Sequence, residues 1–94
     1  MAKREKLFKI GEVMEYSGVS RQTLHNYTLA GLIAAEKRTR AGHRLYDESV
    51  FDYLDRIKML QKENYTLMQI KELFQAEKRI REQQEKRQLS IDFE

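Results

Sequence analysis

The sequence of 94 residues contains no cysteine and no proline. The absence of cysteine excludes a disulfide framework, a thiolate nucleophile and cysteine-based zinc or iron-sulfur sites. No segment has the apolar length of a signal peptide or of a bilayer-spanning helix, so we predict a cytoplasmic protein without membrane contact. The two histidines lack clustered carboxylates, and no nucleophile and base form a recognisable set. We therefore expect no metal, no cofactor and no enzymatic activity.

Positive charge is concentrated in the first half of the chain. Residues 1–46 carry nine Lys and Arg against four Glu, a net charge of +5, whereas residues 47–94 carry a net charge of −2. A polyanion such as nucleic acid would be drawn to the basic half. The alternative is a solubilising surface that binds nothing.

The stretch IGEVMEYSGVSRQTLHNYTLAGLI, residues 10–33, organises the chain. Its apolar spacing predicts one helix over residues 10–17 and a second over residues 21–30. Gly18 can take the positive φ of the intervening turn, Ser20 can cap the second helix, and Gly31 can end it. This pattern indicates a helix-turn-helix, with these apolar residues expected to pack inward: Ile10, Val13, Met14, Val19, Leu24 and Leu29.

The second predicted helix leaves a polar surface near its N-terminal end. A recognition helix meets the edges of DNA bases at this end, through side chains that donate and accept hydrogen bonds. We therefore predict DNA contacts from Arg21, Gln22, Thr23, His25 and Asn26.

Residues 36–46, EKRTRAGHRLY, predict a two-stranded hairpin, or wing, with its turn at Gly42. Leu45 is expected to face inward, and the basic side chains are expected to point outward: Arg38, Arg40, His43 and Arg44. A basic hairpin beside a helix-turn-helix is suited to contacting phosphates or entering the minor groove. The alternative is an ordinary charged turn.

The remaining segments complete a small, mostly α-helical domain over residues 1–75. A short lead-in strand over residues 7–10 should bury Phe8, and a third helix should follow Asp47. Asn64 can take a left-handed conformation, and Thr66 with Gln69 matches a capping box that opens a fourth helix. The apolar faces predicted for these two helices are Val50, Phe51, Leu54, Ile57 and Leu60, then Leu67, Ile70, Leu73 and Phe74.

Residues 76–94 form a charged stretch that favours helix. Leu73 and Ile80 keep a seven-residue spacing, but Arg87 occupies the next position of that repeat. A coiled coil needs apolar residues at two positions per heptad over several heptads. The segment is therefore either a short dimerisation helix or a solvated helical extension, and the sequence leaves both open.

The motifs IGEV, SGVS, TL, GLI, GHRLY and YTLMQIKEL occur in this order, and together they resemble the DNA-binding domain of the MerR family of bacterial transcription regulators. The resemblance covers residues 7–74. It implies a winged helix-turn-helix with a second helix pair and a C-terminal helical extension, the second helix lying in the major groove. It implies DNA contacts from Ser20 and Tyr27 beside the residues named above, and from Tyr46 in the wing. For the two tyrosines, half-buried packing under the wing is an equally open alternative to stacking on sugars or bases. It also implies a homodimer through the C-terminal helix, and RNA polymerase as a further partner at the promoter.

The sequence departs from the family pattern at two places. Where family members often carry Arg-Thr-Leu-Arg-Tyr-Tyr, this chain reads Gln-Thr-Leu-His-Asn-Tyr over residues 22–27. The family's base preference therefore need not be kept, because Gln and Asn can contact adenine where Arg favours guanine. Only about twenty residues follow Phe74, so we expect no built-in sensor domain. The leading hypothesis is a sequence-specific transcription regulator; the alternatives are an architectural or excisionase-like DNA-bending factor and a protein-interaction module that uses the C-terminal helix.

Overall fold

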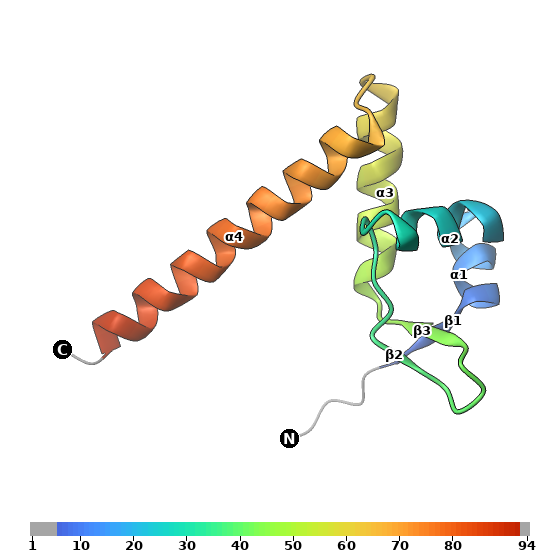
Figure 1. The fold of residues 1–94 in the computed structure, drawn as a ribbon, viewed down its shortest axis with the longest axis horizontal. Helices are drawn as coiled ribbons and strands as arrows, with labels where there is room; N and C mark the ends of the chain where they lie inside the picture. Colours follow the sequence, from blue (N-terminus) through green and yellow to red (C-terminus); the bar gives the residue numbers. More distant parts are fainter. Residues whose placement is uncertain (1–5, 93–94) are drawn as a thin grey trace.

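The chain folds into four helices and a small sheet, as Figure 1 shows for the computed structural model, which describes residues 6–92 and the side chains of residues 6–85. The elements in order are β1 (Phe8–Lys9), α1 (Ile10–Ser17), α2 (Arg21–Leu29), β2 (Lys37–Arg38), β3 (Arg44–Tyr46), α3 (Ser49–Lys62) and α4 (Leu67–Asp92). This confirms the predicted winged helix-turn-helix, the second helix pair and the helical extension. None of the helices in the described part of the chain contains an apolar stretch of bilayer-spanning length.

The turn between α1 and α2 has the predicted glycine conformation. Gly18 has a φ of +72°, and its backbone N–H donates to the carbonyl of Met14 at 2.9 Å, which ends α1. Val19 follows at 9% exposure and packs into the core between the two helices. The turn therefore fixes the angle at which α2 leaves α1.

The wing belongs to a three-stranded antiparallel sheet in the order β1-β3-β2, so the predicted two-stranded hairpin was incomplete. In this sheet Phe8 pairs with Tyr46, and Leu45 lies opposite Lys9 and Lys37. Side chains alternate between the two faces of a strand, so pairing with Phe8 places Tyr46 on the buried face. The prediction that Leu45 faces inward was wrong, because Leu45 is only partly buried whereas Tyr46 is fully buried.

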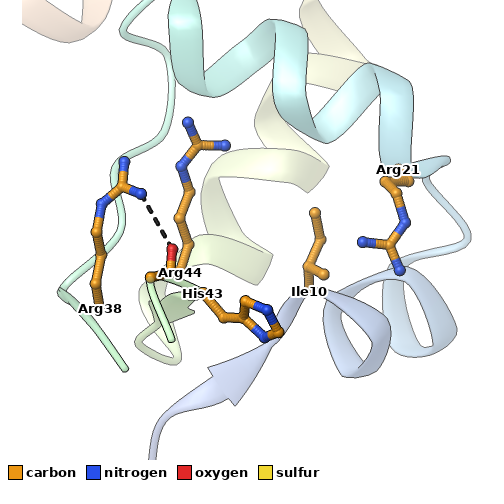
Figure 2. A pocket seen from close by; sticks show the side chains of 6 residues that line it. Ile10, Arg21, Arg38, His43 and Arg44 are labelled. Carbon is orange, nitrogen blue, oxygen red and sulfur yellow. Dashed lines mark hydrogen bonds between the residues drawn. The ribbon is translucent and has the colours of Figure 1, made fainter. Parts of the chain in front are cut away.

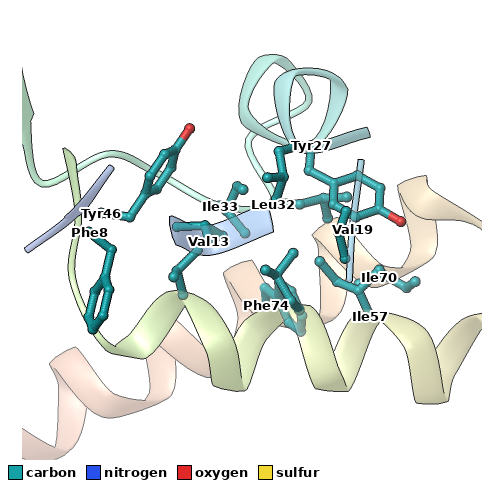
Figure 3. Close-up of a cluster of buried hydrophobic side chains, with 13 residues drawn as sticks. Phe8, Val13, Val19, Tyr27, Leu32, Ile33, Tyr46, Ile57, Ile70 and Phe74 are labelled. Atoms are coloured by element: carbon teal, nitrogen blue, oxygen red, sulfur yellow. The ribbon is translucent and has the colours of Figure 1, made fainter. Parts of the chain in front are cut away.

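One hydrophobic core joins the sheet, the helix-turn-helix and the second helix pair (Figure 3). Two predicted core residues are exposed instead, Leu29 at 68% and Leu67 at 36%. Ile10, Met14, Phe51 and Leu60 are partly buried against the core. Leu73 is also partly buried. The buried members are Phe8, Val13, Val19, Leu24, Tyr27, Leu32, Ile33, Tyr46, Val50, Leu54, Ile57, Ile70 and Phe74.

The connection between α3 and α4 follows the sequence signals closely. Asn64 takes a φ of +70°, the left-handed conformation expected at the break. The backbone N–H of Thr66 donates to Gln69 Oε1 at 2.9 Å, and the N–H of Gln69 donates to Thr66 Oγ1 at 3.1 Å. This reciprocal pair is the predicted capping box. Beyond it, α4 continues away from the helix-turn-helix (Figure 1).

An ion pair fastens α4 to α3. The guanidinium of Arg56 donates to both carboxylate oxygens of Glu77, at 2.7 and 2.6 Å, and also lies 4.9 Å from the centre of the Phe74 ring. The hydrogen bonds from Arg56 lower the pKa of Glu77, and those same bonds raise the pKa of Arg56. The two side chains are 40% and 38% exposed, so solvent screens much of this attraction.

We expect Glu77→Gln to lower the free energy of unfolding at neutral pH by about 0.5–1 kcal/mol, the upper range for a screened surface pair. The folded-state pKa of Glu77 is depressed, so its contribution is present above the ordinary carboxyl pKa and is lost as the pH falls through the folded value. Urea unfolding of parent and variant at neutral and acidic pH measures this difference. Glu72→Gln, on the exposed surface of the same helix, is the control. A difference that persists unchanged into acid would contradict the assignment.

Candidate nucleic-acid interface

The N-terminal end of α2 is stabilised by its own first residues. Ser20 Oγ accepts a hydrogen bond from the backbone N–H of Thr23 at 3.1 Å and donates to Thr23 Oγ1 at 2.9 Å. This is the predicted N-cap. Both hydroxyl groups are therefore engaged in starting the helix, which sets the position of the side chains that follow.

The outward face of α2 carries an amide pair. Gln22 Nε2 donates to Asn26 Oδ1 at 3.0 Å, and both side chains are exposed. Leu29 continues the same face, because residues at positions i, i+4 and i+7 align along a helix. Leu29 was predicted to lie in the core, but it is 68% exposed and therefore belongs to this surface. Amides can read adenine, and an exposed methyl group can contact the methyl of thymine.

The wing presents its cations around a tight turn. Thr39 N–H donates to the carbonyl of His43 at 2.8 Å, and Gly42, with a φ of +85°, donates to the carbonyl of Thr39 at 2.9 Å. The guanidinium of Arg38 donates to the carbonyl of Gly42 at 3.1 Å, and Arg40 is exposed at the tip. The turn is therefore held by its own hydrogen bonds, and its basic side chains remain at the surface.

A cationic hollow of about 350 Å³ lies between the wing and the start of α2. Figure 2 shows Arg38 and Arg44 extending from the wing, Arg21 on the opposite side, and Ile10 between them. The described residues that line the hollow include no acidic side chain; they are Ile10, Arg21, Arg38, Gly42, His43 and Arg44. Three guanidinium groups around one depression attract an anion, and guanidinium geometry matches a phosphate.

Two tyrosines of the predicted contact set lie in the core instead. Tyr46 is fully buried and its hydroxyl lies 3.0 Å from Thr28 Oγ1, so its side chain cannot reach a nucleic acid. Tyr27 is 8% exposed, with its hydroxyl 3.4 Å from Gln61 Oε1. The physical reason is the pairing of β3 with β1, which turns Tyr46 inward beneath α2. Both tyrosines support the surface from below.

The structure thus divides the predicted residues by position. Ser20 and Thr23 start α2, and Gln22 with Asn26 faces outward. His25 is partly buried and contacts the wing through Arg44, at 3.3 Å between His25 Nδ1 and Arg44 Nη1. The residues gathered around the hollow or at the wing tip are Arg21, Arg38, Arg40, His43 and Arg44.

Three residues of this surface were not predicted from the sequence. Leu29 and Lys37 line a second, open hollow of about 570 Å³, which Arg38 and Arg44 also border. Thr28 joins α2 to the wing through Tyr46. A helical count would have found Thr28, because it lies one turn after His25 on the same side of α2. Nothing in the sequence distinguishes Lys37 from the other basic residues of the hairpin.

Comparison with known proteins gives a family match over most of the chain. Residues 8–77 match the family described as MerR HTH family regulatory protein. Nodulation protein NolA of Bradyrhizobium diazoefficiens is 36% identical over 73 residues, which are 78% of this chain and 31% of NolA. The mercuric resistance operon regulatory protein of Bacillus cereus is 38% identical over 66 residues, 70% of this chain and 50% of that protein.

A solved structure shows the same fold. The N-terminal part of MtaN, the Bacillus subtilis multidrug transporter activator, superposes with a TM-score of 0.67 at 28% identity, covering 89% of this chain and 90% of that one. The chain thus spans between about a third and a half of the length of the curated relatives above. The similarity therefore lies in the winged helix-turn-helix and the helix pair that follows it.

Proposed function

The chain belongs to the MerR family of helix-turn-helix regulatory proteins, and on that basis we propose that it regulates transcription by binding a specific double-stranded DNA sequence. In this proposal α2 lies in the major groove and the wing, residues 36–46, contacts the flanking phosphate backbone. The observation that carries the proposal is the cationic hollow between Arg21 on α2 and Arg38 and Arg44 on the wing.

The proposed contacts divide into two kinds. Gln22 and Asn26 form an exposed amide pair on the outward face of α2, where direct base contacts are made. The arginines around the hollow, with Arg40 at the wing tip, would bind phosphates. An interface built this way gains its affinity largely from the arginines and its sequence preference from the amides.

We propose a domain boundary near residue 75. Phe74 is the last buried residue among the side chains that the structure describes, although Glu77 still reaches Arg56. Beyond these contacts Ile80 is 55% exposed, seven residues after Leu73. A second copy of the chain could cover this apolar pair, so we propose a homodimer through α4, which at a promoter would act together with RNA polymerase. Arg87, the next residue of that repeat, lies outside the described side chains.

Selection from a randomised duplex pool at two salt concentrations tests the function. We expect binding that weakens with salt and an enriched motif. An enriched two-fold repeat supports the homodimer, and an enriched single site supports a monomeric regulator. Binding without any enrichment would replace regulation by an architectural DNA-bending role. No binding at low salt would overturn the proposal and leave the protein-interaction module.

We expect Asn26→Ala to relax base preference at one position of the selected site, at a cost of about 1–3 kcal/mol on the preferred sequence. Asn26 would contact a base through hydrogen bonds, which depend on the identity of that base. A phosphate contact, in contrast, carries no sequence information. Competition binding against single-base variants of the selected duplex measures the effect. Arg44→Ala is the comparison, because it should weaken all duplexes alike. Equal losses on every duplex for Asn26→Ala would contradict the assignment.

A further inference from the structure

Two side-chain hydrogen bonds join α2 to the strand β3 of the wing. Thr28 Oγ1 lies 3.0 Å from the Tyr46 hydroxyl, and His25 Nδ1 lies 3.3 Å from Arg44 Nη1. His25 and Thr28 are one turn apart on α2, while Arg44 and Tyr46 are two residues apart on one face of β3. The Thr28 contact holds a fully buried tyrosine, whereas the His25 contact involves two partly buried groups beside the cationic hollow.

The chemistry of this contact decides which group donates and which accepts. A guanidinium group has five N–H donors and no acceptor, so Arg44 can only donate. A hydrogen bond between the two groups therefore has His25 Nδ1 as its acceptor, in the tautomer that carries the ring proton on Nε2. The Nδ1 lone pair is therefore committed to Arg44, and only Nε2 remains to face a nucleic acid.

We propose that His25 is a positioning residue for Arg44, a role that rests on the proposed DNA-binding function. Arg38 donates to the carbonyl of Gly42 within its own turn, so it moves with the wing. Arg44 is instead held against α2, which sets its distance from the amides of Gln22 and Asn26. A phosphate bound by Arg44 is then in register with the bases read by α2. A long side chain held before binding also loses less conformational entropy when DNA binds.

Two substitutions separate this role from a direct base contact. Asn places its Oδ1 at the same bond distance from Cβ as His Nδ1, so His25→Asn keeps an acceptor for Arg44. Gln extends one atom further and reproduces the reach of Nε2 instead. Positioning of Arg44 therefore predicts rescue by His25→Asn, and a base contact through Nε2 predicts rescue by His25→Gln. Both variants have neutral amide side chains, which makes them matched controls for each other.

The experiment measures affinity of the full chain for a fixed mixed-sequence duplex over about 50–200 mM salt. We expect His25→Ala and His25→Gln each to lose about fivefold in affinity, with the salt slope moving towards that of Arg44→Ala, a change of up to about 0.9. His25→Asn should stay within about twofold of the parent. The double variant His25→Ala with Arg44→Ala should bind no more weakly than Arg44→Ala alone, because both remove the same contact.

The other outcomes would overturn either the positioning role of His25 alone or the proposed DNA-binding function as well. Additive losses in the double variant, or rescue by Gln and not by Asn, would overturn the positioning role while the proposed function stands. Failure of the parent chain to bind the duplex would overturn the proposed function and the inference with it. Nitrogen NMR of the imidazole gives a readout without DNA: the His25 Nδ1 signal should shift in Arg44→Ala but not in Arg38→Ala. No shift in Arg44→Ala would also overturn the contact.

Discussion

Replacing Arg21, Arg38 and Arg44 together with alanine is expected to weaken binding to a mixed-sequence duplex by on the order of 100- to 1,000-fold at low salt. The three guanidinium groups surround one hollow, so the variant removes the charge that would hold the phosphate backbone. Each lost phosphate contact should also reduce the salt slope by about 0.9, so the slope should fall by nearly three for the triple variant. Titrations of labelled duplex at several salt concentrations measure both quantities.

The control removes the same charge elsewhere. Lys78, Arg79 and Arg81 lie on α4 and do not line the hollow between Arg21, Arg38 and Arg44. Replacing these three with alanine lowers the net charge equally and should change the affinity far less, because non-local attraction is screened within about 10 Å at ordinary salt. If both triple variants lost affinity and salt slope to the same extent, binding would depend on total charge and the hollow would not be the phosphate site.

The features that the sequence predicted well depend on residues close together in the chain. The left-handed conformations of Gly18 and Asn64 are properties of single residues, and the capping box of Thr66 and Gln69 spans three positions. Hydrogen bonds of this range are encoded locally, so a residue type at a given spacing is enough to indicate them. The bounds of α1 were predicted for the same reason, between its apolar start and the Ser17-Gly18 break.

The errors depend on contacts between distant segments. The face of β3 that turns inward is decided by pairing with β1, in which Phe8 meets Tyr46 across 38 positions of sequence. Without that pairing, Leu45 is the more apolar choice for the core, and Tyr46 was named as a DNA contact with packing under the wing as the alternative. A register shift of one residue moves every side chain of the strand to the opposite face of the sheet. The contact between His25 and Arg44 also joins segments that are distant in the sequence, so it could not be predicted from local patterns.

Leu24 and Leu29 show the limit of helical periodicity on α2. Both were assigned to the core from their apolar character and the spacing of the helix-turn-helix. In the structure Leu24 is fully buried between the helices, whereas Leu29 is 68% exposed beside Gln22 and Asn26. A helix that ends after nine residues offers few repeats from which to fix the buried face. The difference can be measured, because the two leucines share a helix and a side-chain type.

We expect Leu24→Ala to lower the free energy of unfolding by about 2–5 kcal/mol, the range for removing a buried leucine side chain and leaving a cavity. A domain of this size has little stability in reserve, so this variant should be largely unfolded at moderate temperature. Leu29→Ala should change the free energy by no more than about 0.5 kcal/mol, because its side chain is mostly in water. Leucine and alanine both favour helix, so the change in helix propensity is small at either position and the contrast reports mainly burial. Urea unfolding followed by circular dichroism measures both values, and equal losses would show that Leu29 is covered in solution, contrary to its place on the proposed base-reading surface.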